Sequence, residues 1–391
     1  MKKLLLIAAL AAAALGVHAQ GYNLELLWEV NPTELFATTG DVRQGFGMNG
    51  KFYINDKSTQ TIYIVDRTKV TGMGDANGNG QVGIADVTQL INYLMSGNES
   101  DIVWANCDLD FNGKVTIADV TSLISMLMNQ NAMPTLPGGP NCAITRDEAG
   151  NIILSMAAFP GNAAGSSIKV LNPVTGETKE YEIPEECGFQ GRCDFFGFAK
   201  GNLMEDGAIY LTGGNTNQDA IYTDGVAVFT VADGEVDTDN CFLAPVNSGI
   251  VGQTSTVINY YTDIDGEEAL IYAYRSGYPT KLTFDGNMYN KTSLNLPAAG
   301  GYNKGHCNGA FPFIWDDMEL IIYPLLPDYR DGWAIAEAGA ESPIVYVTAT
   351  TSSNPNGFQN NWLNAEVDDE GVTIYQYMPG YIIRVYRLTK I

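Results

Sequence analysis

Short apolar runs separated by polar turns make up most of the chain after residue 20. In the stretch 45–65, the apolar residues Phe46 and Met48 are followed by a turn at Asn49 and Gly50, and two further apolar runs follow. Runs of this length that are rich in β-branched and aromatic residues and flank Asn-Gly or Asp-Gly pairs are typical of antiparallel hairpins. This part of the chain is therefore predicted to be mainly β.

The same pattern recurs five more times along the chain. The later copies begin near Ala143, Phe195, Val257, Phe311 and Trp362. A unit of a few strands repeated every 50 to 60 residues or so is typical of a β-propeller, whose blades bury their faces against neighbouring blades. We predict six blades, with the leading strand 24–30 completing the last blade and closing the ring. A pair of β-sandwiches is the alternative.

A stretch of a different kind, 72–135, carries one short motif twice at an offset of 108 − 75 = 33 residues. A 12-residue loop with oxygen-bearing side chains at positions 1, 3, 5 and 12 and a backbone carbonyl ligand at position 7 wraps Ca²⁺. The sequence therefore predicts two bound Ca²⁺ ions. The expected ligands are Asp75, Asn77, Asn79, Gln81 and Asp86 in the first loop, and Asp108, Asp110, Asn112, Lys114 and Asp119 in the second. Because the second loop has three carboxylates and the first has two, we expect the second site to bind Ca²⁺ more tightly.

Each loop is followed by apolar residues at positions i, i+3, i+4 and i+7, a spacing that places them on one face of a helix. These residues are Val87, Leu90, Ile91 and Leu94 in the first copy, and Val120, Leu123, Ile124 and Leu127 in the second. The two helices are predicted to bury these faces against each other. A Gly-rich coil precedes each loop and Asp closes it, whereas an ordinary EF-hand has an entering helix and a closing Glu.

A calcium loop followed by a helix, duplicated and closed by Asp, resembles the dockerin module of cellulosome-type systems over residues 72–132. The resemblance implies a module that folds around Ca²⁺ and docks into a cohesin. In that family the docking surface includes loop positions 10 and 11, which are Ile84, Ala85, Ile117 and Ala118 in this chain. The best-known members carry hydroxyl residues there, so the departure concerns the identity of the partner. The alternative is a calcium site that only rigidifies the protein.

The first residues read as a secretory signal peptide. Lys2 and Lys3 precede an apolar run, and Val17 and Ala19 are small or short residues at the positions that a signal peptidase recognises. We expect cleavage after Ala19 and a location outside the cell, on its surface or in the periplasm.

The expected domains are 1–19 as signal peptide, 20–71 plus 136–391 as propeller, and 72–135 as a calcium module inserted between the first and second repeat units. No later apolar run is long enough to span a bilayer.

Charge and cysteine content narrow the possible partners. The chain has 21 basic and 45 acidic residues, and so acidic a surface repels nucleic acid. Six cysteines are present, of which only Cys107 belongs to the duplicated stretch. Five remain, an odd number, and Cys187 with Cys193 is the best pair on sequence spacing. None of the cysteines has the spacing of a zinc site.

Ligand chemistry in the propeller has weaker support in the sequence. If His18 leaves with the signal peptide, His306 is the one histidine of the mature chain, and no G-x-S-x-G motif accompanies it. His306, Trp315 and Asp316 form one candidate sugar-binding group and Trp362 marks a second, because aromatic rings stack on pyranose faces while polar groups bind hydroxyls. The alternative is that these aromatics are blade core. We assign no catalytic residue.

The favoured function is that of a secreted calcium-binding protein. Its dockerin-like module would dock a propeller to a cohesin-like scaffold or surface partner in polysaccharide binding or degradation. One alternative is a polysaccharide-degrading enzyme, a glycoside hydrolase or lyase, with a dockerin tether. A second alternative is a propeller braced by calcium that has no docking partner.

Overall fold

The computed structural model describes most of the chain and divides it into two compact units, Met1–Asp66 with Thr135–Ile391, and Arg67–Pro134. The described residues are 17–19, 21–36, 40–66, 74–79, 82–98, 100, 102–109, 114–128, 134–156, 167–190, 195–213, 223–249, 256–274, 277–301, 309–325, 331–350 and 360–391. No helix in these ranges combines the length and the apolar character that crossing a membrane requires.

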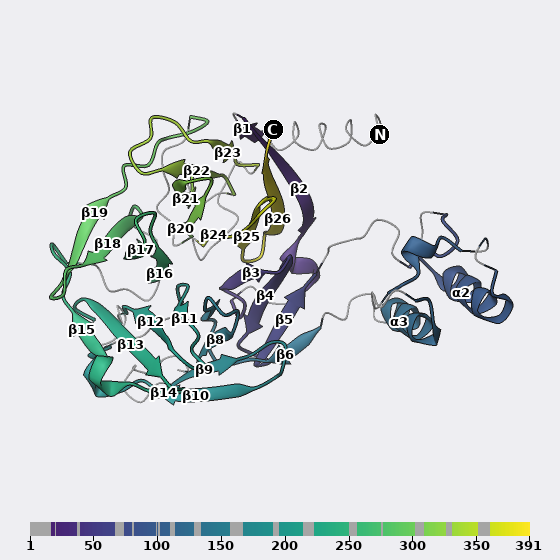
Figure 1. Ribbon diagram of the computed structural model, residues 1–391, viewed down its shortest axis with the longest axis horizontal. Coiled ribbons are helices and arrows are strands. Elements are labelled where there is room, and N and C mark those ends of the chain that lie inside the picture. Colours follow the sequence, from purple (N-terminus) through teal and green to yellow (C-terminus); the bar gives the residue numbers. More distant parts are fainter. Residues whose placement is uncertain are drawn as a thin grey trace. The chain divides into compact units, whose positions relative to one another are not determined.

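Among the described residues of the larger unit, six antiparallel sheets follow one another around a ring, and the prediction of a six-bladed propeller is confirmed (Figure 1). The first three blades are β3 (Gly45–Met48), β4 (Lys51–Asp56), β5 (Thr61–Val65) and β6 (Thr135–Pro137); β7 (Ile144–Arg146), β8 (Ile152–Ser155), β9 (Ser167–Leu171) and β10 (Thr178–Glu182); and β11 (Lys200–Gly201), β12 (Gly207–Leu211), β13 (Val226–Ala232), β14 (Glu235–Val236) and β15 (Phe242–Ala244).

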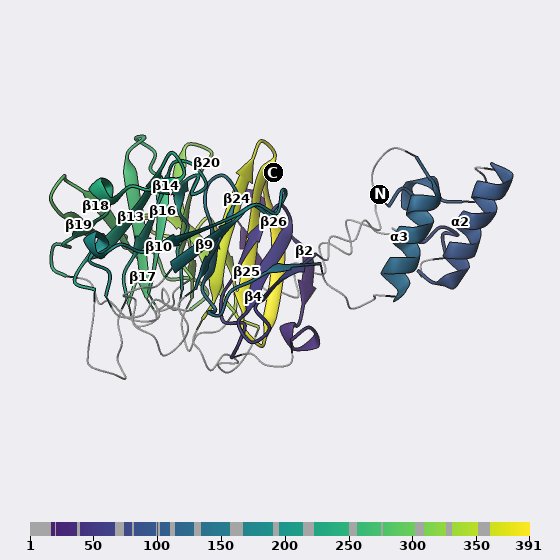
Figure 2. The ribbon, with the colours of Figure 1, turned by 90° about the horizontal axis from the view of Figure 1, so that it is seen from below.

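The other three blades complete the ring. They are β16 (Thr256–Thr262), β17 (Glu268–Tyr274), β18 (Thr280–Phe284) and β19 (Tyr289–Ser293); β20 (Phe311–Trp315), β21 (Met318–Pro324), β22 (Trp333–Glu337), β23 (Val345–Val347) and β1 (Val17–Ala19); and β24 (Trp362–Asp368), β25 (Gly371–Met378), β26 (Ile382–Lys390) and β2 (Tyr22–Val30). Short 3₁₀ turns lie at Pro32–Glu34, Glu185–Cys187 and Thr238–Asn240. Figure 2 shows the blades from the side, with the strands of neighbouring sheets running next to one another.

The ring is closed by strand β2, as predicted. β2 pairs antiparallel with β26, from Tyr22 opposite Lys390 to Val30 opposite Ile383. Leu24, Trp28 and Val30 are buried on one side of β2, as expected for a strand with one face in the core. The first and last segments of the propeller sequence therefore share one blade.

The segment before β2 contributes a further strand, β1, which pairs with β23 at the edge of the fifth blade. Cleavage after Ala19 would remove β1 and leave the four-stranded order β23-β22-β21-β20 in that blade. The rest of the predicted signal peptide, 1–16, lies outside the described residues, so cleavage stays a prediction.

The calcium module is inserted at a different place from the one expected. The sequence predicted an insertion between the first and second repeat units, but the insert joins β5 to β6, which pair with each other, for example Tyr63 with Thr135. The insert therefore interrupts the first blade between its third and fourth strands. The expectation was wrong because β6 is only three residues long, ends in Pro137 and directly follows Pro134, so the strand looked like part of a linker.

Three buried amide side chains connect the innermost strands of neighbouring blades. Gln44 accepts hydrogen bonds from Ile144 N (3.1 Å) and Phe196 N (3.0 Å), and donates to Phe196 O (2.6 Å). Asn259 accepts from Phe198 N and donates to Ala310 O, each at 2.8 Å. Asn364 makes the same pair of bonds to Gly47 N and O. Because buried backbone groups need partners, these amides fasten blade to blade.

We predict that Asn259→Ala destabilises the propeller. The change leaves Phe198 N and Ala310 O unpaired at a buried position, which costs about 1–3 kcal/mol for each group, so the free energy of unfolding should fall by about 2–6 kcal/mol. Urea denaturation followed by tryptophan fluorescence measures the change. Asn290→Ala, which removes an exposed hydrogen bond to Asp285, is the control. Equal losses in the two variants would contradict the fastening role.

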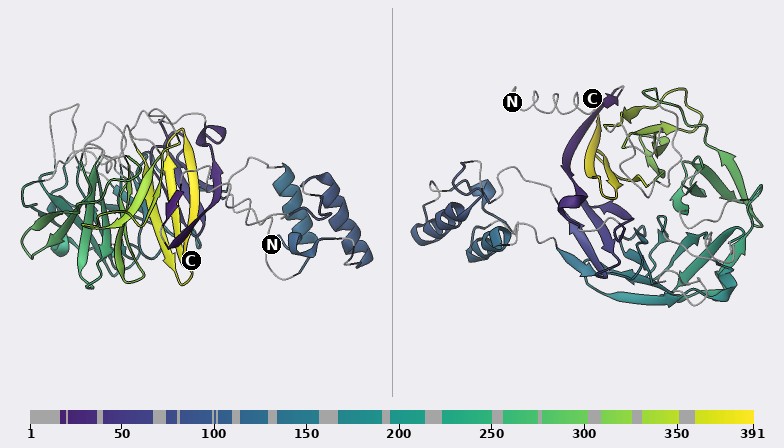
Figure 3. Two further views of the ribbon diagram at one scale, coloured as in Figure 1. Left: turned by 90° about the horizontal axis from the view of Figure 1, so that it is seen from above. Right: turned by 180° about the vertical axis from the view of Figure 1, so that it is seen from behind.

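The smaller unit contains α2 (Ile84–Ser96) and α3 (Ile117–Met128), with a 3₁₀ turn at Trp104–Asn106 between them. The two helices lie side by side (Figure 3). Its core contains Val87, Leu90, Val120 and Leu123, together with Ala76, Cys107 and Val115. Both predicted helices are confirmed.

The prediction that each whole apolar face is buried is wrong in part. Ile91 is 39 % exposed, Leu94 36 % and Ile124 37 %. A single facing helix covers only the residues that point straight at it, and positions four and seven residues further round the face lie at its margin. An apolar margin on each helix is therefore available to a partner.

Candidate functional site

In the first loop of the module, polar side chains converge at the start of α2. Asn79 N donates to both Asp75 Oδ1 and Asn77 Oδ1 at 3.0 Å, which brings these two side-chain oxygens to one backbone group. Asp86 is fully buried; its Oδ1 accepts from Asn77 N (3.1 Å) and its Oδ2 from Gly83 N (2.8 Å). Asp86 therefore closes the loop and caps the helix at the same time.

The second loop repeats the closing arrangement. Asp119 is fully buried, and its Oδ1 accepts from Leu109 N while its Oδ2 accepts from Thr116 N, each at 2.7 Å. The Thr116 hydroxyl also lies 3.2 Å from Asp119 Oδ2. The Oδ2 partners Gly83 and Thr116 are equivalent in the 33-residue repeat, whereas the Oδ1 partners Asn77 and Leu109 differ by one repeat position.

The two loops are joined by backbone hydrogen bonds. Gly74 N donates to Asn106 O (2.7 Å), Val103 N to Ala76 O (2.9 Å), and the Asn106 amide to Asp75 O (2.9 Å). Burial, followed by the charges of Asp119, Asp86 and Asp75, raises the pKa of the Cys107 thiol to about 11. Carboxylates of both loops therefore lie close enough to the buried Cys107 thiol to raise its pKa.

These described residues fit a hard cation. Ca²⁺ takes six to eight oxygen ligands from carboxylates, amides and carbonyls, and Asp75, Asn77 and Asp86 bring such oxygens together. Each carboxylate oxygen that accepts one backbone N–H keeps a second lone pair for a metal. Within the described ranges, no three acidic, histidine or cysteine side chains gather as a metal site, because the first loop has two carboxylates and uses amides for the rest.

Five further predicted ligands belong to these loops. Gln81, Asp110 and Asn112 lie outside the described residues. Asp108 is half-buried and Lys114 is exposed. The complete ligand set stays a prediction.

The predicted docking residues all lie at the surface. Ile84 is 76 % exposed and Ile117 68 %, and Ala85 and Ala118 are also exposed. Each isoleucine is the first residue of its helix. Two large apolar side chains thus stand in water at equivalent positions of the repeat.

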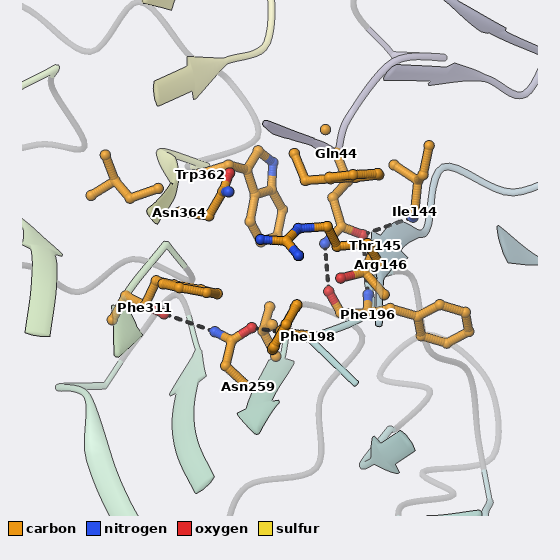
Figure 4. A pocket seen from close by; sticks show the side chains of 15 residues that line it. Gln44, Ile144, Thr145, Arg146, Phe196, Phe198, Asn259, Phe311, Trp362 and Asn364 are labelled. Carbon is orange, nitrogen blue, oxygen red and sulfur yellow. Dashed lines mark hydrogen bonds between the residues drawn. The ribbon is translucent and has the colours of Figure 1, made fainter. Parts of the chain in front are cut away.

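The centre of the propeller contains a cavity of about 40 Å³ (Figure 4). Gln44, Arg146, Asn259, Phe311 and Trp362 are among the residues that line it. The Arg146 guanidinium lies 3.3 Å from Glu366 and 4.8 Å from the centre of the Phe198 ring, and burial lowers its pKa against the charge of Glu366. A cavity of this volume has room for a few water molecules and not for a sugar ring.

The four candidate ligand residues of the propeller have different surroundings. Trp362 lines the cavity and donates to Arg43 O at 2.6 Å. Trp315 is buried and lies 5.3 Å from the Tyr22 ring of the closing strand. Asp316 occupies the β20–β21 turn with φ +58° and forms an ion pair with Lys390. His306 lies outside the described residues, so a sugar site at these positions stays a prediction.

The sequence analysis did not identify two features of the structure, the amides that join the blades and the exposed margin of the module helices. The interblade role of Asn259 has a signal, a single amide within the otherwise apolar run of β16, whereas Gln44 precedes β3 and Asn364 shares β24 with acidic residues. The exposed margin of the module helices also has one: Ile84, Thr88 and Ile91 recur as Ile117, Thr121 and Ile124. A spacing of four and seven residues marks a second stripe beside the buried face.

Comparison with known protein families supports the smaller unit. The family model of the dockerin type I domain matches residues 73–128. A search of the curated proteins gave no match.

Solved structures of low identity resemble the chain. The N-terminal domain of Nup159 aligns with 95% of this chain and 97% of its own at 8% identity and a TM-score of 0.40. The RS223 β-xylosidase aligns with 63% of this chain and 90% of its own at 8% identity and a TM-score of 0.37. Likenesses at this level carry no argument about function.

The family match and the six sheets together identify the molecule. Dockerin domains bind calcium and dock into cohesins, and the proteins that carry them are typically extracellular or on the cell surface. The chain is a six-bladed β-propeller protein that carries a dockerin type I module in its first blade.

Proposed function

We propose that the chain is a secreted protein that holds two Ca²⁺ ions and uses its dockerin module to attach the propeller to a cohesin-like scaffold or surface protein. The observation that carries this proposal is the pair of exposed isoleucines, Ile84 and Ile117, at the same position of the two calcium-loop repeats. The setting of polysaccharide binding or degradation follows from the cellulosome-type systems in which dockerins occur.

The exposed surface of each helix is an apolar stripe. Thr88 and Thr121 donate their hydroxyls back to Ile84 O and Ile117 O at 3.0 Å, so neither hydroxyl has its proton available for a partner. Ile91 and Ile124 extend the two stripes by one further turn. Exposed apolar side chains that repeat in this way mark a protein-binding surface more often than chance exposure.

The chemistry of the stripe indicates the partner's chemistry. Isoleucine and alanine stand where familiar dockerins carry hydroxyl residues, so the matching cohesin surface should be apolar at its centre, with a polar rim. A hydrogen-bonding cohesin would leave its own polar groups unpaired against Ile84 or Ile117, which costs about 1–3 kcal/mol for each group. The chain should therefore discriminate against such cohesins.

We predict that the two stripes substitute for each other. Because the repeats are nearly symmetric, a partner can dock on either stripe, and Ile84→Glu or Ile117→Glu alone should weaken binding only about twofold, by removing one of two equivalent modes. The double variant should weaken it about 30-fold or more, the effect of losing a buried apolar anchor. Surface plasmon resonance in Ca²⁺ measures both. Val174→Glu, at a 91 % exposed valine of the propeller, is the matched control.

The partner itself is sought in culture supernatant and cell-surface extracts of the producing organism. Immobilised mature protein should retain a protein with a cohesin domain in Ca²⁺ and release it in chelator, and the double glutamate variant should retain none. Calcium-dependent capture that contains no cohesin-domain protein in repeated trials would overturn the docking proposal.

A further inference from the structure

Two cysteines from separate segments of the third-blade region meet in the propeller core. Cys187 ends the 3₁₀ turn Glu185–Cys187 and is fully buried, and Cys241 follows the turn Thr238–Asn240 and is 4 % exposed. Both belong to one apolar cluster, which also contains Phe229 and Val231 of β13. Two thiols are therefore placed together although 54 positions separate them in the sequence (241 − 187).

Both sulfur atoms lie on the same edge of β13. Cys187 Sγ donates to Val228 O at 3.3 Å, and Cys241 Sγ accepts from Thr230 N at 3.4 Å and lies 3.8 Å from Thr230 O. Residues two apart on a strand direct their backbone groups to the same neighbour. Val228 and Thr230 therefore hold the two thiols side by side, next to the point where Phe242 pairs with Val228.

The two thiols also affect each other's ionisation. A hydrogen bond to Cys241, and burial after it, raise the pKa of the Cys187 thiol, whereas the same hydrogen bond lowers the pKa of Cys241 to about 7 against the effect of burial.

We propose that Cys187 and Cys241 form a disulfide bond in the exported protein, as one covalent link between the connection before β11 and the outer edge of the third blade. The oxidant is a disulfide of the export compartment, either of low molecular weight or on a folding catalyst. The thiolate of one cysteine attacks it to give a mixed disulfide and releases the first thiol of the oxidant, and the thiolate of the other cysteine then attacks the mixed disulfide and displaces the second. The two protons lost by the cysteines and the two electrons end on the two thiols to which the oxidant is reduced.

The bond replaces the pairing expected from the sequence. Cys193 lies outside the described residues, whereas the Cys187 thiol points to β13 and forms no disulfide in the structure.

Because both sulfurs are buried in the folded chain, oxidation must occur before the blade closes. An early bond would also restrict the unfolded chain, which stabilises the fold most for long loops.

The test is a disulfide map of the mature protein, exported through the periplasm of an expression host and purified without reductant. The sample is denatured in iodoacetamide, digested and analysed by mass spectrometry. We expect a cross-linked pair of peptides that contains Cys187 and Cys241, two hydrogens lighter than the sum of the thiol forms. Alkylation of both cysteines, or a link from either one to Cys193 or Cys307, overturns the proposal.

A melting experiment on the wild-type protein tests the bond without depending on whether a variant folds. Reduction should lower the melting temperature of the wild-type propeller by about 5 °C or more, as loss of a disulfide that closes a loop of this length does in a domain of this size. Cys241→Ser should melt at the reduced value with or without reductant. Cys142→Ser, at another buried cysteine, should keep the full response. A wild-type melt that is indifferent to reductant contradicts the proposal.

Discussion

Chelation of calcium is expected to unfold the dockerin module while the propeller stays folded. The double variant Asp86→Ala, Asp119→Ala should behave in the same way in the presence of calcium. Both aspartates are fully buried and hold two backbone N–H groups each through their two oxygens. Without them the loops lose their closing ligands and both helices lose their N-terminal caps.

The energetic reason is the small size of the module. A core of about 60 residues seldom supplies more than about 3–5 kcal/mol, and a ligand present at about 1,000 times its dissociation constant contributes about 4 kcal/mol per site. Two calcium sites, at about 8 kcal/mol together, therefore contribute more than the core itself. In their absence, Asp75 and Asp86 also repel each other at buried positions, which lowers the stability further.

The propeller should stay folded when the module unfolds, because its stability comes from its own hydrophobic clusters. The buried residues of the module, such as Leu90 and Leu123, form a cluster of their own, and the strands β5 and β6 that flank the insert are paired with each other. Unfolding the insert lengthens a surface connection, and loop closure becomes only slightly more costly with length.

Two measurements decide the outcome. Calorimetric titration of Ca²⁺ into the chelator-stripped protein should give two sites, the tighter of which is lost in Asp108→Ala. Helical circular dichroism and a thermal melt should then show loss of the module transition and an unchanged propeller transition. Asn98→Ala, at an exposed position between α2 and the second loop, is the control. A propeller that melts earlier in chelator would instead support calcium as a brace for the whole protein.

The module was predictable because its sequence is written twice. Every ligand position, the glycines and the apolar helix faces recur at one offset, so the two helices were predicted; α2 and α3 begin at Ile84 and Ile117, loop position 10 of each repeat. What the repeat could not show is how much of each face one partner helix covers. Ile91 and Ile124 match the helical period of Leu90 and Leu123, yet they lie at the exposed margin, because burial depends on the neighbour and not on the period alone.

The propeller was predictable in its number of blades and in its closure, because each blade repeats a hairpin pattern and the strand at 24–30 had no place in the first unit. Two tertiary features were not. Strand β6 is defined by its pairing with β5 across the insert and has little strand character of its own. Asn364 reads as one of several turn-forming asparagines, but it lies within β24 and fastens that strand to Gly47. Such roles depend on contacts between distant residues, which a single sequence does not display.

Removal of a buried ion pair at the ring closure is expected to lower the free energy of unfolding of the propeller strongly. Arg384 of β26 lies 2.9 Å from Asp331 and 2.5 Å from Glu29 of β2, and Asp331 also accepts from Thr350 N at 2.8 Å. Asp331 is fully buried and Arg384 is 4 % exposed. The pair links the fifth blade to the strand pair that closes the ring.

We predict that Asp331→Ala lowers the free energy of unfolding of the propeller by about 3 kcal/mol, because it removes the fully buried carboxylate that faces the Arg384 guanidinium and leaves only the partly exposed Glu29 as an acidic partner. The double variant Asp331→Ala, Arg384→Met should recover much of this loss, since replacement of both members of a buried pair by apolar groups costs far less than removal of one. Urea denaturation of the four proteins of the cycle gives the coupling energy between the two residues.

The control for this cycle lies three residues further along the same strand. Arg387 pairs with Asp368 at 2.5 Å, but the Asp368 side chain is 58 % exposed. The hydrogen bond from Arg387 lowers the pKa of Asp368 to about 2, yet solvent screens an exposed pair, so Asp368→Ala should cost no more than about 1 kcal/mol. If the two aspartate variants lost equal stability, burial would not be the cause. If Arg384→Met failed to rescue Asp331→Ala, the loss would come from the hydrogen bonds of Asp331 to Thr350 and not from an unpaired charge.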